Sequence, residues 1–300
     1  MIAIIGFLSA LFVLLPLSFI WRLWRLDAPT RLTWLLVLSE TAAVIGLILI
    51  LGRWDVSGVW TRPGLAGLAL AAAGVSLVRH RGRPWFAGDR GSLDARLATT
   101  ALSLLIFGAA LAYVVAGMGH HEGARALSFP LAGGRFVIAQ GGGIAVLNHH
   151  SDHPAQRHAL DITAVNGAGF RAAGLLPKDP SRYAIFGKAV VSPCEGTVIA
   201  AVDGFPDLSP PMTDRKNAAG NHVILSCDGI RVELAHLREG SIVAAIGARL
   251  VTGMPIGEVG NSGNSTEPHL HIHAVDDRSG AAVPITFDGR VPVRNAQFFR

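Results

Sequence analysis

The chain has 300 residues, of which 50% are hydrophobic, and a mean hydropathy of +0.42. This composition excludes a purely soluble protein, and the length allows one membrane region and one domain of ordinary size. The net charge of +5 does not indicate a nucleic-acid-binding protein, because much of the basic charge flanks apolar segments and no basic stripe with interleaved aromatic residues is present.

Four apolar segments account for the hydrophobic excess and predict transmembrane helices near residues 2–20, 32–51, 59–78 and 97–118. The first segment is uncharged, lacks a basic start and ends in an aromatic and basic edge, Trp21-Arg22-Leu23-Trp24-Arg25. This pattern is typical of an anchor rather than of a cleaved signal peptide. The third segment is the weakest prediction, and a re-entrant or interfacial helix is its alternative.

The placement of arginines predicts the orientation of these spans. Three arginines follow the first span and five follow the third, whereas two lie between the second and the third and none precedes the first. The positive-inside rule then places the first and third connections in the cytoplasm. We therefore expect a multi-pass protein of the cytoplasmic membrane, with both termini and the C-terminal domain on the extracytoplasmic side.

Glu40 interrupts the second span, and an ionisable group at membrane depth is costly and often functional. A helix–helix contact is the alternative role for it. A membrane sensor or transporter is a further functional class that the spans allow. The sequence argues against a sensor or transporter, because the spans show no internal repeat and Glu40 is the one buried charge that they carry.

Residues 119–127 are predicted to form a linker and residues 128–300 a separate domain. Short apolar segments punctuated by Gly and Pro predict an all-β domain with few or no helices. The expected strands are 136–139, 144–147, 159–165, 189–192, 197–202, 223–226, 231–235 and 270–275. Residues 166–187 and 203–219 are too polar and proline-rich for strands, and such loops commonly wall a substrate groove.

Both cysteines, Cys194 and Cys227, fall in the domain expected outside the cytoplasm. Cysteines on neighbouring strands pair in an oxidising compartment, so we expect a structural disulfide. Two buried free thiols are the alternative. Their spacing matches no zinc motif.

The segment Glu267-Pro268-His269-Leu270-His271-Ile272 carries the strongest functional signal. Two histidines one residue apart on a strand point to the same face, so both can reach one metal ion, or one can bind the metal while the other acts on a substrate. With Asp161 upstream and His236 between, they predict a zinc hydrolase site with imidazole and carboxylate ligands. His273 continues the alternation, so the pattern alone does not say which two histidines matter.

Several motifs follow one another in a fixed order in this region. They are Gly220-Asn221-His222-Val223, Leu234-Ala235-His236-Leu237, Gly253-Met254-Pro255-Ile256-Gly257, Gly260-Asn261-Ser262-Gly263-Asn264-Ser265 and Pro268-His269-Leu270-His271. In order and spacing they resemble the lysostaphin-type zinc metallopeptidases, also called the LytM or peptidase M23-type domain, over about residues 128–300. The resemblance implies a mostly antiparallel β domain of the duplicated hybrid motif type. It also implies a Zn²⁺ cofactor and cleavage of stem peptides or cross-links in peptidoglycan.

The same resemblance implies roles for individual residues. Asp161 and His271 correspond to zinc ligands, and His236 and His269 correspond to the two catalytic histidines. One of these two would act as general base on the attacking water, and the other would stabilise the oxyanion of the tetrahedral intermediate.

The remaining zinc ligand is where the sequence departs from the family pattern. The family commonly has a histidine four residues before the aspartate, and that position is Arg157 here. The run Asn148-His149-His150-Ser151-Asp152-His153 resembles family members in which an insertion before the aspartate strand displaces the first histidine, so we expect His150 to replace it. His158 and then His149 are the next candidates, and His153 is the least favoured. On a regular strand His158 would face away from Asp161, so it would need a bulge.

Two functions remain open at this point. One is a membrane-anchored zinc endopeptidase, and the other is a non-catalytic scaffold or activator of other cell-wall hydrolases with the same fold. Cell-wall or division-machinery proteins are the partners expected for either. Asn221, His222 and Asn264 are candidates to line the groove, and turn residues that satisfy backbone groups are the alternative.

Overall fold

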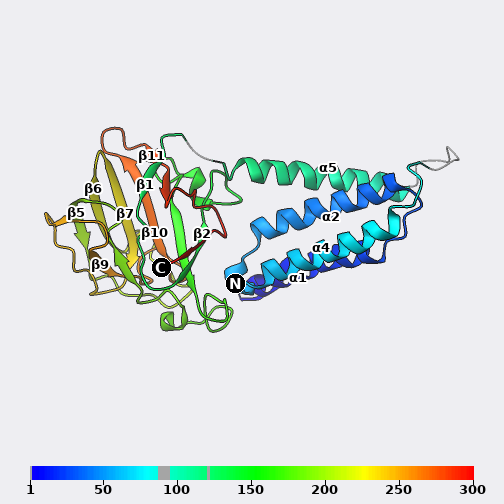
Figure 1. Cartoon of the computed structure of the whole chain (residues 1–300). Coiled ribbons are helices and arrows are strands. Elements are labelled where there is room, and N and C mark those ends of the chain that lie inside the picture. Colours follow the sequence, from blue (N-terminus) through cyan, green and yellow to red (C-terminus); the bar gives the residue numbers. More distant parts are fainter. Residues whose placement is uncertain (1, 87–94, 120–121) are drawn as a thin grey trace. The chain divides into compact units, whose positions relative to one another are not determined.

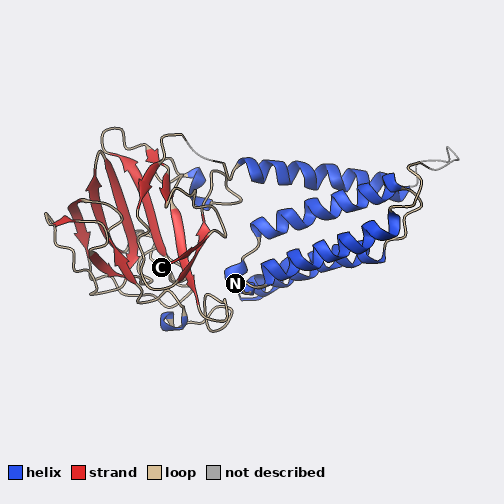
Figure 2. Cartoon of the chain, viewed as in Figure 1, coloured by secondary structure: helices blue, strands red, loops and turns tan. Residues whose placement is uncertain are grey.

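The computed structural model describes residues 2–86, 95–119 and 122–300. The described chain divides into two compact units, Ala3–Ala116 and Gly117–Arg300. The first unit is built from helices and the second from strands (Figure 1). Figure 2 shows the same division by secondary structure.

Long helices dominate the first unit. They are α1 (Ile2–Arg25), α2 (Arg31–Leu51), α4 (Thr61–His80) and α5 (Ala95–Ala116), and a single turn, α3 (Trp54–Ser57), follows α2. Helices of 20 to 24 residues are roughly 30–36 Å long, which matches the hydrocarbon core of a bilayer. Among the described residues, four helices are long and apolar enough to cross a membrane, which confirms the predicted helices. The sequence did not predict α3.

Several polar groups buried among these helices have partners within the unit. Glu40 on α2 is buried and forms an ion pair with Arg22 on α1. Trp34 Nε1 donates to Ser76 Oγ at 3.0 Å, and His80 Nδ1 donates to the Ser76 carbonyl at 2.7 Å. The ion pair joins α1 to α2, and the bond from Trp34 to Ser76 joins α2 to α4. Glu40 therefore serves a helix–helix contact.

A mostly antiparallel sheet forms the body of the second unit, as the sequence predicted (Figure 1). Its strand order is β13-β2-β3-β10-β7-β6-β5-β8, and β11 pairs with β10. The bounds are β2 (Arg135–Gln140), β3 (Leu160–Val165), β5 (Gly196–Val202), β6 (Asn221–Cys227), β7 (Ile230–Leu237), β8 (Arg249–Leu250), β10 (Leu270–Asp276), β11 (Ala282–Val283) and β13 (Gln297–Phe299). Two small sheets pair β1 (Arg125–Leu127) with β12 (Ile285–Phe287) and β4 (Ala189–Val191) with β9 (Pro255–Glu258).

Two sequence expectations differ from this structure. Residues 144–147 were expected to form a strand but form a turn instead. Gly142 has a φ of +121°, and the chain then enters a 3₁₀ turn, η1 (His149–Asp152), so no strand can continue through this segment. Residues 119–127 were expected to be a linker; residues 120 and 121 of this segment lie outside the described residues, and Arg125–Leu127 form β1.

The core lies on one face of the sheet and leaves the other face of β10 for polar groups. Leu270, Ile272 and Ala274 of β10 belong to the core cluster. Because side chains alternate along a strand, the intervening His271 and His273 lie on the opposite face. The same core contains a group of aromatic rings that pack against one another, Phe129, Phe136, Phe287 and Phe298.

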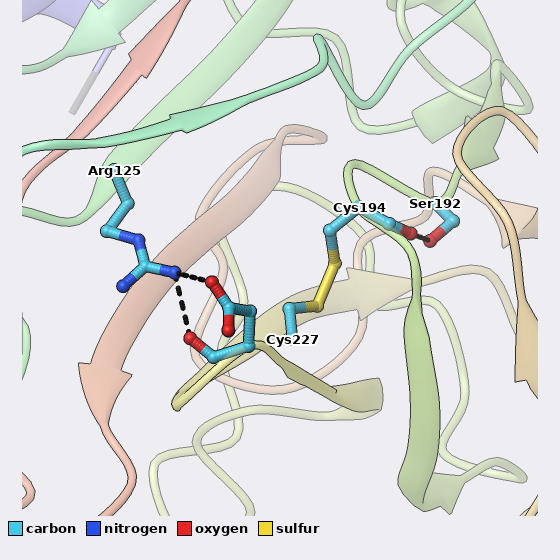
Figure 3. The surroundings of a disulfide bond; sticks show 5 residues. Arg125, Ser192, Cys194 and Cys227 are labelled. Atoms are coloured by element: carbon cyan, nitrogen blue, oxygen red, sulfur yellow. Dashed lines mark hydrogen bonds and ion pairs between the residues drawn. A yellow bond between two sulfur atoms is a disulfide. The ribbon is translucent and has the colours of Figure 1, made fainter.

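Cys194 and Cys227 form a disulfide, with their Cα atoms 6.2 Å apart. This confirms the sequence prediction. The bond joins the loop after β4 to the end of β6 (Figure 3). Arg125 pairs with the Asp228 carboxylate at 2.6 Å beside it.

Candidate metal centre

Asp161 and His271 lie directly opposite each other on neighbouring antiparallel strands. The register of β3 and β10 pairs these two residues, and directly opposed residues point to the same face. His271 Nδ1 lies 3.1 Å from Asp161 Oδ1. Both residues are buried, with 4% and 6% of their surface exposed. A carboxylate and an imidazole nitrogen therefore converge at one point of the sheet.

His150 reaches the same carboxylate from outside the sheet. Its Nε2 lies 3.0 Å from Asp161 Oδ1. The fully buried Asn148 caps the 3₁₀ turn η1 by accepting from the backbone N–H of His150, and it donates to the Ala159 carbonyl at 3.0 Å. Asn148 thus ties the turn to the chain that leads into β3, and this positions His150 over Asp161.

The other candidates for the missing ligand are placed differently. His149 is exposed, yet its ring lies 3.9 Å from that of His150. Ligand atoms of His149, His150 and Asp161 lie within 4.8 Å of one another, so these three form one group able to hold a metal ion. His158 is outside that group, in the turn before β3, and His153 is exposed.

Two triads therefore share His150 and Asp161 and differ in their third member, His149 or His271. We favour the triad with His271, because His150 and His271 both already face the same oxygen of Asp161. His149 lacks comparable burial.

His236 enters the site through an unusual backbone conformation. On β7, Ala235 is paired with His271, so a regular strand would turn His236 to the opposite face. His236 instead has a φ of +63°, and the pairing of β6 with β7 shifts register here. Its ring centroid consequently lies 4.8 Å from that of His269. Its backbone N–H and C=O are both hydrogen-bonded, to Ala219 and Gly260, and these bonds help hold the strained conformation.

Backbone carbonyls fix the tautomers of His236 and His269. His236 Nδ1 lies 2.9 Å from the Ser262 carbonyl, and His269 Nδ1 lies 2.8 Å from the Glu267 carbonyl. A carbonyl can only accept, so each Nδ1 carries a proton. When neutral, each ring keeps its lone pair on Nε2. In His269 this nitrogen lies 3.5 Å from Asp161 Oδ1.

The surroundings of Asp161, His236 and His269 shift the pKa values of these groups in different directions. Burial alone would raise the pKa of Asp161, but the nearby His269 and the hydrogen bonds from surrounding imidazoles hold it well below its ordinary value. Burial lowers the pKa of His236 well below its ordinary value, and neighbouring imidazoles add to this effect. Burial also acts to lower the pKa of His269, but the Asp161 carboxylate outweighs it, so that pKa lies above its ordinary value. Asp161 is therefore ionised and His236 neutral at physiological pH.

Sequence reasoning missed the residues that hold these groups in place. Glu267, whose carbonyl binds His269, forms an ion pair with the buried Arg171 at 2.6 Å. Asn148 and Ser262 carry no signal beyond their presence in turn-rich runs. His273 stood out only as a third member of the alternation, and burial lowers its pKa to about 3.

Two of the three groove candidates, Asn221 and His222, hydrogen-bond to the backbone. Asn221 is fully buried, accepts from the Phe205 N–H at 2.8 Å and donates to the Leu237 carbonyl at 3.0 Å. His222 Nδ1 donates to the Gly220 carbonyl at 2.8 Å. The side chains of these two residues therefore support turns, while Asn264 is exposed.

Comparison with known proteins finds one family match within the second unit. The sequence profile of Peptidase family M23 matches residues 182–283. No curated protein sequence matches the chain.

Solved structures of several bacterial proteins are similar to segments of this chain. The catalytic domain of lysostaphin from Staphylococcus simulans is 23% identical, with a TM-score of 0.26 over 33% of this chain and 68% of that one. A zinc-containing peptidase from Vibrio cholerae is 20% identical, with a TM-score of 0.34 over 53% and 39% of the two chains. A putative peptidase M23 from Pseudomonas aeruginosa is 19% identical, with a TM-score of 0.31 over 60% and 59%. The chain thus spans less than two thirds of the Vibrio and Pseudomonas proteins.

Proposed function

The second unit carries a LytM/M23-type domain, and on that premise we propose that the chain is a membrane-anchored zinc metalloendopeptidase acting on peptidoglycan. The observation that carries this proposal is the convergence of His150 and His271 on one oxygen of the buried Asp161. The bonds to be cleaved are peptide bonds of stem peptides or cross-links.

The donor set of the site suits zinc. Two imidazole nitrogens and one carboxylate oxygen are a common three-ligand set for a catalytic zinc ion, which leaves a further position open. Asp161, His150 and His271 would hold the ion. When bound, zinc supplies a Lewis acid that lowers the pKa of water and polarises a carbonyl group. The ionised state of Asp161 already favours a cation at this point.

His236 and His269 would transfer a proton and stabilise the developing negative charge during the reaction. His236 is neutral and has its lone pair on Nε2, so it is suited to accept a proton from the attacking water. The pKa of His269 is raised, which suits a hydrogen-bond donor to the developing oxyanion. Opposite pKa directions in neighbouring groups favour such a division of roles. No helix with a His-Glu-x-x-His motif occurs in the sequence, so an imidazole takes the place of a glutamate base.

The long helices of the first unit would anchor the domain in the cytoplasmic membrane. The distribution of arginines supports an extracytoplasmic location of the second unit, where peptidoglycan lies. The disulfide supports the same location, because disulfides persist in oxidising compartments. Fusions of a periplasmic reporter enzyme to the C-terminus should be active, and fusions after residue 86 inactive. The reverse pattern would refute this orientation.

The test of the proposed function uses the full chain in detergent. We expect one zinc ion per chain and release of new amino groups from purified peptidoglycan, with both lost in His271→Ala and Asp161→Ala.

An alternative function, a non-catalytic activator of other hydrolases, is favoured by one observation, the arginine at position 157 where the family has a ligand. Wild-type protein that binds no zinc and releases no amino groups would support that alternative.

A further inference from the structure

His273 is a buried group next to the candidate metal centre that the proposed mechanism does not use. It lies two residues after His271 on β10, so both side chains project from the same face. His273 Nδ1 lies 3.1 Å from His271 Nε2, and 7% of the residue is exposed. His273 therefore contacts the nitrogen of His271 that faces away from Asp161.

The chemistry of His271 decides which ring nitrogen carries the proton. Its Nδ1 faces Asp161 Oδ1, and a metal ion held by both residues requires a lone pair on that nitrogen. The proton of a neutral imidazole must then reside on Nε2. Nε2–H in turn needs an acceptor inside the domain. Neutral His273 offers that acceptor at Nδ1, with its own proton on Nε2.

We propose that His273 is a positioning residue that fixes the tautomer and the ring orientation of His271 for metal binding. This inference rests on the proposed function. Histidines that ligate metals commonly donate their second nitrogen to a carboxylate or a backbone carbonyl. Here a neutral imidazole fills that place, so the orientation is achieved without a further negative charge beside the ion. His273 acts through His271 and touches neither metal nor substrate.

The experiment measures the Zn²⁺ affinity of the full chain in detergent by competition with a chromophoric chelator. In His273→Phe a ring of similar volume lacks the acceptor, and we expect about 10- to 100-fold weaker binding. In His273→Asn the amide oxygen can take the place of Nδ1, and we expect affinity close to that of the wild type. His222→Ala removes a half-buried histidine whose Nδ1 serves Gly220, and it is the matched control.

Thermal unfolding in excess chelator shows whether each variant folds. If His273→Phe does not fold, His273→Gln provides a second test. Its amide lies one carbon farther out, near the place of Nε2, so this variant should also lose affinity. Equal zinc affinity in the wild type, His273→Phe and His273→Gln would overturn this inference and leave the proposed function intact. A wild type that binds no zinc would overturn both.

Discussion

Arg171 and Glu267 form an ion pair with Arg171 Nη2 and Glu267 Oε2 2.6 Å apart, and the Arg171 side chain is 3% exposed. The pair joins the 166–187 loop to the segment immediately before β10. The Arg171 guanidinium also donates to the Leu175 carbonyl at 2.9 Å and lies over the Tyr183 ring. The Glu267 carbonyl accepts a hydrogen bond from His269 Nδ1, so this ion pair helps to position a proposed catalytic residue.

Replacing Arg171 with alanine should destabilise the second unit. Removal of one partner from a buried ion pair leaves an uncompensated charge and costs about 3–5 kcal/mol. Urea unfolding of a fragment of residues 122–300, followed by far-UV circular dichroism, measures the loss. The fragment contains the complete core cluster and the disulfide of this unit, so it is expected to fold by itself.

Arg238→Ala is the matched control. Arg238 and Glu258 also form an ion pair at 2.6 Å, but their side chains are 47% and 41% exposed. Such a surface pair contributes at most about 1 kcal/mol. Equal losses of unfolding free energy in the two variants would show that burial of the Arg171 pair has no energetic consequence.

Alanine variants of the three candidate histidines should identify the remaining zinc ligand. We expect His150→Ala to lose bound zinc, because its Nε2 faces Asp161. His158→Ala should keep its zinc. His149→Ala should keep most of it, since His149 is exposed and lacks a direct contact of the kind that His150 makes. Zinc is measured by metal analysis after dialysis. Loss of zinc in both His150→Ala and His149→Ala, with its retention in His271→Ala, would assign the alternative triad, and retention of zinc in His150→Ala would exclude His150 as a ligand.

The difference between these histidines shows where sequence reasoning succeeds and where it stops. His269 and His271 share one face because strands alternate, and this could be read from the sequence. The long apolar helices were equally readable from length and composition. His150, however, reaches Asp161 through a 3₁₀ turn capped by Asn148, and no periodic pattern encodes such a turn. The position of His150 was therefore predicted through family resemblance.

His236 illustrates a second limit. Strand periodicity alone turns it away from the face of His271, and only its positive φ and the nearby register shift bring it into the site. Short strands such as β8 and β11, of two residues each, are likewise set by tertiary contacts. Residues 144–147 do not form the predicted strand for a related reason, because the positive φ of Gly142 redirects the chain before them.

Substitution of His236 should separate the backbone strain from the chemistry of the ring. Both His236→Ala and His236→Asn should keep zinc, yet lose most of the hydrolytic rate, by about 10²- to 10⁴-fold. Asn tolerates a positive φ better than Ala does, so His236→Asn should be the more stable variant, by about 1 kcal/mol. Rates come from amino-group release and stabilities from urea unfolding. Full activity in either variant would remove His236 from the mechanism.

The phenol of Tyr183 should titrate at unusually high pH. Tyr183 is 2% exposed, and burial together with the nearby Glu267 carboxylate raises its pKa from 10.0 to about 12. It is the only tyrosine in a fragment of residues 122–300, and that fragment contains no tryptophan. Absorbance at the phenolate band therefore reports this one group. We expect a midpoint near 12 in the folded fragment.

The raised pKa of Tyr183 predicts how the stability of the fragment changes at alkaline pH. An acid whose pKa is raised by folding holds its proton more tightly in the folded state, so its contribution is complete below the unfolded pKa of about 10. As the pH rises from about 10 to about 12, the unfolded chain ionises first, and up to about 2–3 kcal/mol of stability is lost. Urea unfolding at several pH values, compared with Tyr183→Phe, isolates this contribution. The Tyr183→Phe variant should lose less stability over this window, because it has no phenol to ionise. A folded-state midpoint near 10, or identical pH dependence in the two proteins, would contradict the burial of an un-ionised phenol beside Glu267.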